Sequence, residues 1–116
     1  MKETIASIIK WHEQTFPIAD LQGQLSKFAD ERKEFEQEPS LEEWADMFIV
    51  ACGIARFDSI LALHYFSDCF KILAHQAIRN IYIQQAVDKK MQINRKRKWN
   101  KIGNKFQHIE EGGDND

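Results

Sequence analysis

Two pairs of carboxylates stand out in the sequence, Glu31 with Glu34 in DERKE and Glu43 with Asp46 in EEWAD. Residues three apart on a helix share a face, so each pair would project two carboxylates in the same direction. Like charges held this close raise each other's pKa unless a cation lies between them. Four oxygen ligands suit Mg²⁺ or Mn²⁺ and leave coordination positions for water and phosphate. The sequence therefore predicts a divalent metal site at these four side chains.

Asp46 is the only strongly polar side chain between Trp44 and Ala55, a stretch that reads as buried helix. A buried carboxylate normally has a hydrogen-bond partner, a counter-charge or a metal ion. A di-iron site is disfavoured because no glutamate is followed by histidine at the Glu-x-x-His spacing. The remaining acids of this region, Glu36, Glu38 and Glu42, are expected to be solvated, and Trp44 is expected to lie in the core.

The elements that must position these acids are helices, because the 116 residues contain only two prolines and show no strand-like alternation of useful length. Length favours one domain. Helices are predicted over residues 3–15, from the cap Asp20 to about Glu36, from the cap Ser40 to about Arg56, and over 60–81 and 83–99, with Asp58 and Ser59 able to cap the fourth. The expected fold is an all-α antiparallel bundle of four to five helices over residues 1–105, followed by a disordered polar tail over 106–116. A short turn at Pro39 would make the second and third helices antiparallel neighbours and bring the four acids together.

The third and fourth predicted helices are apolar over much of their circumference. One small bundle cannot easily cover so much apolar surface, so helices contributed across an oligomer interface are expected. The longest apolar run, Met47 to Ala55, is too short for a bilayer span, and the start of the chain lacks the apolar core of a signal peptide. A cytosolic protein without a membrane partner is the expectation. Cys52 and Cys69 are isolated and are expected to be reduced.

Basic side chains gather at the other end of the chain. The sequence carries 16 basic and 18 acidic residues, a balance that argues against a general nucleic-acid coat, but residues 89–105 hold eight basic residues and no acid. Lys90, Asn94 and Arg97 follow at spacings of four and three, so they can reach one ligand together, whereas Arg95, Lys96 and Lys98 are expected to face solvent. Lys27, one turn before Glu31, is a further candidate for a phosphate contact. No P-loop GK[ST] occurs, so phosphates would be held by metal and side chains.

Four segments between Trp11 and Trp99, in the order WHEQTFP, KFADERKEF, PSLEEWADMFI and KMQINRKRKW, resemble the MazG-like all-α nucleoside triphosphate pyrophosphohydrolases. Within that superfamily they are most similar to the phage and bacterial dATP/dGTP pyrophosphohydrolases. The resemblance implies that Glu31, Glu34, Glu43 and Asp46 bind Mg²⁺ or Mn²⁺. It also implies hydrolysis of a (d)NTP, expected to be a purine dNTP, between the α and β phosphates, in a dimer or a pair of dimers inside a bacterial cell or phage-infected host.

The resemblance assigns the phosphates to Lys90, Asn94 and Arg97. Glu34 and Glu31 are the expected catalytic carboxylates, with Glu34 able to orient or deprotonate the attacking water. Three aromatic residues in the matching segments, Trp11, Phe16 and Trp99, are candidates for stacking on the base, and His12 is the histidine expected to line the pocket.

A second hypothesis comes from a different class of protein. A helical interaction module without catalytic activity could use its basic last helix to bind nucleic acid or an acidic partner. Such a module has no evident reason to place carboxylates three apart twice at the edge of its core. The acids therefore favour the enzyme over the binding module.

Overall fold

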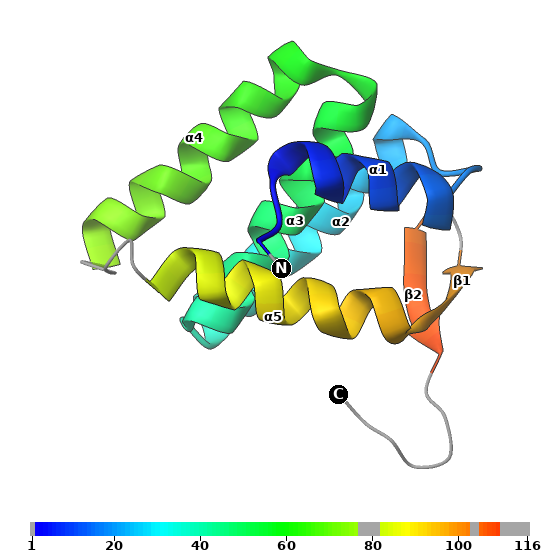
Figure 1. Cartoon of the computed structure of the whole chain (residues 1–116). Coiled ribbons are helices and arrows are strands. Elements are labelled where there is room, and N and C mark those ends of the chain that lie inside the picture. The colour runs from blue at the N-terminus through cyan, green and yellow to red at the C-terminus, as the bar shows by residue number, and fades with distance from the viewer. Residues whose placement is uncertain (1, 77–81, 103–104, 110–116) are drawn as a thin grey trace.

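The computed structural model describes residues 2–76, 82–102 and 105–109. Five helices make up most of this part of the chain (Figure 1): α1 (Ile5–Thr15), α2 (Leu21–Gln37), α3 (Leu41–Phe57), α4 (Ser59–Gln76) and α5 (Ile83–Lys96). The expected helical class is confirmed. The predicted fourth helix extended to residue 81, but residues 77–81 lie outside the described part of the chain. No helix in the described residues combines the length and the apolar character that a bilayer span requires.

Short polar side chains fix the starts of four helices. Each accepts a hydrogen bond from a backbone N–H that the first helical turn leaves unpaired. The acceptor and donor residues are Thr4 and Ser7 for α1, Asp20 and Gly23 for α2, Ser40 and Glu43 for α3, and Asp58 and Leu61 for α4. The caps predicted at Asp20, Ser40 and Asp58 are therefore confirmed.

Helix α3 is the centre of the fold and packs against each of the other four helices. Its buried side chains cover most of the circumference of the helix and include Trp44, Met47, Cys52 and Ile54, all 0% exposed. The other helices of the chain thus cover most of the apolar surface of α3. In Figure 1, α4 extends to one side of this centre, and α1 and α5 cross in front of α2 and α3.

A β-hairpin follows α5 and corrects two sequence predictions. Strands β1 (Lys98–Ile102) and β2 (Lys105–Ile109) pair antiparallel, with Lys98 opposite Ile109 and Ile102 opposite Lys105, and β2 lies against α2. The last helix therefore ends at Lys96 rather than at residue 99, and residues 106–109 belong to a strand rather than to a disordered tail. The apolar residues Trp99, Ile102, Phe106 and Ile109 recur at spacings of three and four, which imitates a helix, so the alternation typical of a strand is missing from the sequence.

The N-terminal residues before α1 are tied to α5 by an ion pair that sequence reasoning missed. Arg95 donates from Nε and Nη2 to the two carboxylate oxygens of Glu3, at 3.0 and 2.9 Å. The Glu3 backbone N–H also donates to Asp88 Oδ1 at 2.8 Å, and its carbonyl accepts from Gln84 Nε2 at 2.8 Å. Arg95 is exposed, as expected, but it is also a structural residue, because its two parallel hydrogen bonds hold the residues before α1 against α5.

Replacing Glu3 with glutamine is expected to destabilise the protein in a pH-dependent way. The hydrogen bond from Arg95 lowers the pKa of Glu3 from its ordinary value of 4.5. A lowered pKa in the folded state stabilises the fold above the ordinary value, and this contribution is lost as the pH falls through the folded-state pKa. Because Arg95 is partly exposed, we expect the free energy of unfolding of wild type to exceed that of Glu3→Gln by only about 1 kcal/mol at pH 7.

Urea unfolding of both proteins at pH 7 and at pH values below 4.5 measures this difference. The difference in free energy of unfolding between the two proteins should become smaller as the pH falls below 4.5 and Glu3 becomes protonated. A difference that is the same at every pH would show that the ion pair is not its cause.

Candidate active site

One cavity of about 400 Å³ lies between α1, α2, α3, α5 and the first residues of β1. It gathers every residue that the sequence marked as a site candidate, although they come from positions 11 to 99. These residues are Trp11, His12, Phe16, Lys27, Glu31, Glu34, Glu43, Asp46, Lys90, Asn94, Arg97 and Trp99. Volumes of this order are typical of pockets for small molecules.

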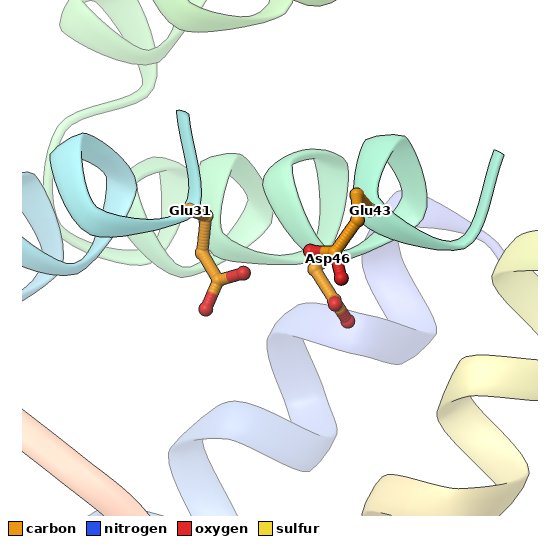
Figure 2. A group of neighbouring side chains, drawn as sticks. All are labelled: Glu31, Glu43 and Asp46. Atoms are coloured by element: carbon orange, nitrogen blue, oxygen red, sulfur yellow. The ribbon is translucent and has the colours of Figure 1, made fainter. Parts of the chain in front are cut away.

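Acidic side chains form one part of the cavity wall. Glu31 from α2 and Glu43 and Asp46 from α3 lie on the same side of this helix pair (Figure 2), and one oxygen of each lies within 4.8 Å of the other two. Glu34, the fourth predicted ligand, lines the same cavity but is exposed and is not one of the three. The turn at Pro39 thus brings together three of the four acids, with the fourth beside them.

Two lysines partly neutralise this cluster. Lys90 Nζ lies 3.4 Å from Asp46 Oδ2, and Lys27 Nζ lies 3.3 Å from Glu31 Oε1. The counter-charge of Asp46 in the protein alone is therefore Lys90. One oxygen of Glu31 and one of Glu43, Oε2 in each case, is buried without a hydrogen-bond partner in the described residues. Two lysines thus leave part of the carboxylate surface uncompensated.

The pKa values of all three acids reflect this crowding. Burial raises the pKa of Glu31, and the charge of Asp46 raises it further. Burial followed by the charge of Asp46 raises the pKa of Glu43. Burial also raises the pKa of Asp46, although Lys90 opposes that rise. A divalent cation among the three would favour their charged forms, and three carboxylate oxygens are the donor type that Mg²⁺ and Mn²⁺ prefer, so the residues fit such an ion.

Aromatic rings form another part of the wall. Trp11 and Phe16 meet edge to face with centroids 5.4 Å apart, and Phe16 meets Trp99 in the same way at 5.2 Å. The Trp99 indole N–H donates to the backbone carbonyl of Asn94 at 3.2 Å, which ties the first strand to the end of α5. These contacts hold three rings in fixed positions beside the cavity, where a flat group could stack on them.

The predicted phosphate-binding residues are also neighbours. Arg97 Nη1 donates to Asn94 Oδ1 at 3.3 Å, and Lys90 lies one turn earlier on α5, next to Asp46. The three side chains line the cavity although Arg97 follows the end of the helix. Positive charge therefore lies next to the acids inside the cavity.

His12 is the histidine of the cavity wall and is 4% exposed. Its Nε2 lies 3.0 Å from Gln24 Oε1, and its Nδ1 lies 3.1 Å from Arg56 Nη1. Burial lowers the pKa of His12 to about 4, so the ring is neutral at pH 7. His64 and His75 are exposed on α4 and do not line the cavity.

Among the described residues of the cavity wall, the sequence did not mark Gln24, Ile49, Val50 and Ile93 as candidates. A signal for Gln24 was present, since it lies three residues before Lys27 and seven before Glu31 and therefore on the same face of α2. The three apolar residues carry the same signal, since Ile49 and Val50 follow Asp46 by three and four residues and Ile93 follows Lys90 by three. An apolar side chain on such a face is equally compatible with the core, so its spacing alone does not place it at a cavity.

The arrangement can hold a ligand that combines a divalent cation, negative charge and a flat apolar group, because the cavity offers a matching surface to each. Comparisons of the chain with models of protein families, with curated proteins and with solved structures find no match.

Proposed function

We propose that this protein is a metal-dependent nucleoside triphosphate pyrophosphohydrolase that converts a (d)NTP and water to the (d)NMP and pyrophosphate, with a purine dNTP as substrate. One observation carries the proposal. Three carboxylate oxygens lie within 4.8 Å of one another in a cavity that also contains basic and aromatic side chains. The motif resemblance described above supplies the bond that is cleaved and the purine preference.

Glu31, Glu43 and Asp46 would hold the Mg²⁺ or Mn²⁺, with Glu34 beside them. An ion bound there would supply Lewis acidity toward the phosphates and lower the pKa of a bound water. Glu34 is exposed at the cavity wall and is the carboxylate that would orient or deprotonate the water attacking the α phosphorus.

In this mechanism the two lysines of the cavity bind the phosphates of the substrate after the metal ion has neutralised their acidic partners. Lys27 and Lys90 pair with Glu31 and Asp46 in the protein alone. Once a cation neutralises those acids, both ammonium groups become available for the triphosphate. Lys90 and Arg97 would then offset the charge that develops on the departing pyrophosphate, with Asn94 as a neutral neighbour.

The nucleoside would lie at the aromatic part of the cavity, where Trp11, Phe16 and Trp99 offer stacking surfaces. Stacking contributes roughly 1 to 3 kcal/mol per base and does not by itself distinguish the bases. Discrimination between purines therefore depends on polar groups near these rings.

The alternative is a helical interaction module whose basic last helix binds nucleic acid or an acidic partner. Lys90 and Arg97 line the cavity, next to the acids, and Arg95 is bonded to Glu3. This arrangement divides three of the basic residues at this end of the chain between two separate sets of contacts, whereas a phosphate backbone requires a continuous basic surface. The positions of these side chains favour the enzyme.

The direct test incubates the protein with each of the four dNTPs and the four NTPs, with Mg²⁺ or Mn²⁺, and separates the products by chromatography. We expect equal amounts of monophosphate and pyrophosphate, the highest rates with dATP or dGTP, and no turnover in EDTA. Absence of pyrophosphate with all eight nucleotides would refute the proposal. Release of orthophosphate and a nucleoside diphosphate instead would show cleavage between the β and γ phosphates, which would also contradict the proposal.

We also propose that the protein forms a homo-oligomer through α4. Ile60, Leu63 and Phe70 lie on one face of this helix and are 77%, 64% and 52% exposed. Burying such side chains against a second copy would remove apolar surface from water. Other large apolar side chains are exposed in the described residues, but these three share one helix.

The double variant Ile60→Glu/Leu63→Glu is expected to be monomeric, because two carboxylates would have to be buried in the interface. Size-exclusion chromatography with light scattering measures the mass of each protein. Gln22→Glu, which adds a carboxylate at an exposed position of α2, serves as the control and should leave the oligomer intact. A wild-type protein that is already monomeric at tens of micromolar would contradict the interface.

A further inference from the structure

A chain of hydrogen bonds crosses three helices beside the cavity. Arg56 on α3 lies 3.1 Å from His12 Nδ1 on α1, and His12 Nε2 lies 3.0 Å from Gln24 Oε1 on α2. Gln24 lines the cavity, whereas Arg56 does not. These hydrogen bonds therefore connect Arg56, a cation outside the cavity, to the side-chain amide of Gln24 on the cavity wall.

The chemistry of arginine decides the direction of every bond in this chain. A guanidinium group has only donors, so His12 Nδ1 must accept the hydrogen bond from Arg56. A neutral imidazole with an accepting Nδ1 carries its proton on Nε2. The Nε2–H group needs a hydrogen-bond acceptor, and Gln24 Oε1 is the acceptor beside it. The amide of Gln24 is therefore oriented with Oε1 toward His12, because the flipped orientation would place two N–H donors against each other.

Close packing leaves the three side chains little freedom. Arg56 Nη1 also donates to the backbone carbonyl of Phe16 at 2.7 Å, and its guanidinium carbon lies 4.6 Å from the centre of the Phe57 ring. A Cβ atom added at Gly53 would lie 2.6 Å from Gln24 Oε1 and 2.9 Å from His12 Nε2. Glycine at this position thus makes room for the His12–Gln24 hydrogen bond between α3 and the other two helices.

The last group in this series of hydrogen bonds is the amide nitrogen of Gln24. No acceptor among the described residues receives a hydrogen bond from it. Gln24 lies at the aromatic part of the cavity, since its partner His12 has its ring centroid 5.0 Å from that of Phe16. A group that stacks on these rings would have its edge near an N–H donor.

We propose that Arg56 is a positioning residue that holds His12 as the Nε2–H tautomer, so that Gln24 presents its amide N–H to the cavity and binds a hydrogen-bond acceptor on the edge of the base. The nature of the ligand rests on the proposed function. The direction of the hydrogen bonds does not, because it follows from the protein's own contacts.

The tautomer is measured without any ligand. Long-range ¹H–¹⁵N correlation spectra at pH 7 distinguish a protonated Nε2 from a protonated Nδ1 in His12. We expect Nε2–H in wild type and in Arg56→Lys, which keeps a donor, and a mixture of both tautomers in Arg56→Met. A dominant Nδ1–H form in wild type, or unchanged Nε2–H in a folded Arg56→Met, would overturn the role of Arg56.

The ligand contact is measured by steady-state kinetics with the best dNTP. In Gln24→Glu the carboxylate still accepts from His12 but has no N–H, and in Gln24→Met the donor is lost without a change of charge. Both variants are expected to raise KM by about tenfold or more while kcat stays within about threefold. Gln22→Glu is the matched control, because it adds the same charge at an exposed position of α2.

An unchanged KM in Gln24→Met would overturn the contact, because charge repulsion alone would then explain the effect of Gln24→Glu. Failure of the wild-type protein to hydrolyse or bind any nucleotide would overturn the proposed function and the ligand contact together. The tautomer experiment would in that case still decide whether Arg56 positions His12 and Gln24.

Discussion

Replacing Asp46 with asparagine is expected to lower pyrophosphate release by at least about a hundredfold while leaving the protein folded. The substitution preserves the shape of the side chain but removes one of the three carboxylates whose oxygens lie within 4.8 Å of one another. A divalent ion would lose a charged ligand, and Lys90 would lose its ion-pair partner. Initial rates at saturating dNTP, together with Mn²⁺ titration by calorimetry, measure the effect on turnover and on metal affinity.

The matched control for this prediction is Glu42→Gln. Glu42 adjoins Glu43 on α3 but is exposed and does not line the cavity, so removing its charge should change neither rate nor metal affinity by more than about twofold. The free energy of unfolding of Asp46→Asn should stay within about 1 kcal/mol of wild type, because removing one charge from a crowded acidic cluster offsets the loss of the Lys90 pair. An Asp46→Asn protein that retains full activity would remove the acidic cluster from the mechanism.

Replacing Trp44 with alanine is expected to reduce the free energy of unfolding by about 3 to 5 kcal/mol, the largest stability effect we anticipate for a single substitution. Trp44 is 0% exposed, its ring stacks on Phe48 with centroids 5.4 Å apart, and its indole N–H donates to the carbonyl of Cys69 at 2.9 Å. Alanine would leave a cavity between α3 and α4 and would remove the hydrogen bond that joins the two helices at the Cys69 carbonyl. Urea unfolding followed by circular dichroism measures the loss.

Phe70→Ala provides the comparison for Trp44→Ala. Phe70 belongs to the same aromatic group, with its ring 6.2 Å from that of Trp44, but it is 52% exposed. When both substitutions are made in the monomeric Ile60→Glu/Leu63→Glu protein, the removal of the Phe70 ring should cost no more than about 1 kcal/mol, because about half of its surface stays exposed when no second copy covers α4. If both substitutions cost the same, burial of Trp44 would not be what holds α4 on α3.

Trp44 also matters for the site, because it lies between Glu43 and Asp46 in the sequence and points into the core. Its burial sets the rotation of α3 about its own axis, and that rotation directs the two acids into the cavity. A folded Trp44→Ala protein should therefore lose metal affinity as well as stability. The packing on one face of α3 and the chemistry on the other are consequences of the same helix orientation.

The sequence contained enough to predict most of the helices and the residues that converge. Caps such as Asp20 and Ser40 act on N–H groups two or three residues away, and pairs such as Glu31 with Glu34 share a face because of helical geometry. Both signals are local. One turn between two helices was then sufficient to predict that acids from α2 and α3 would meet.

The hairpin after α5 was missed for a physical reason. The apolar residues of this segment have helical spacing in the sequence: Trp99, Ile102, Phe106 and Ile109. The two strands are stabilised by hydrogen bonds to each other, and the order of apolar residues within one strand does not reveal that pairing. One usable signal existed: Gly103 and Asn104 stand between the two strands, and a pair of this type often joins the strands of a hairpin. With that signal the helix would have been ended before Trp99.

By itself, then, the sequence determined the helical class, the starts of most helices and the helix faces that carry the acidic and basic candidates, because these depend on contacts within one or two turns. Only the tertiary structure decided which groups pair. Lys90 with Asp46, Arg95 with Glu3, and Arg56 with His12 are joined across 44 to 92 positions of the chain. Such contacts depend on how separate helices are rotated and packed against α3, and no local spacing in the sequence encodes that packing.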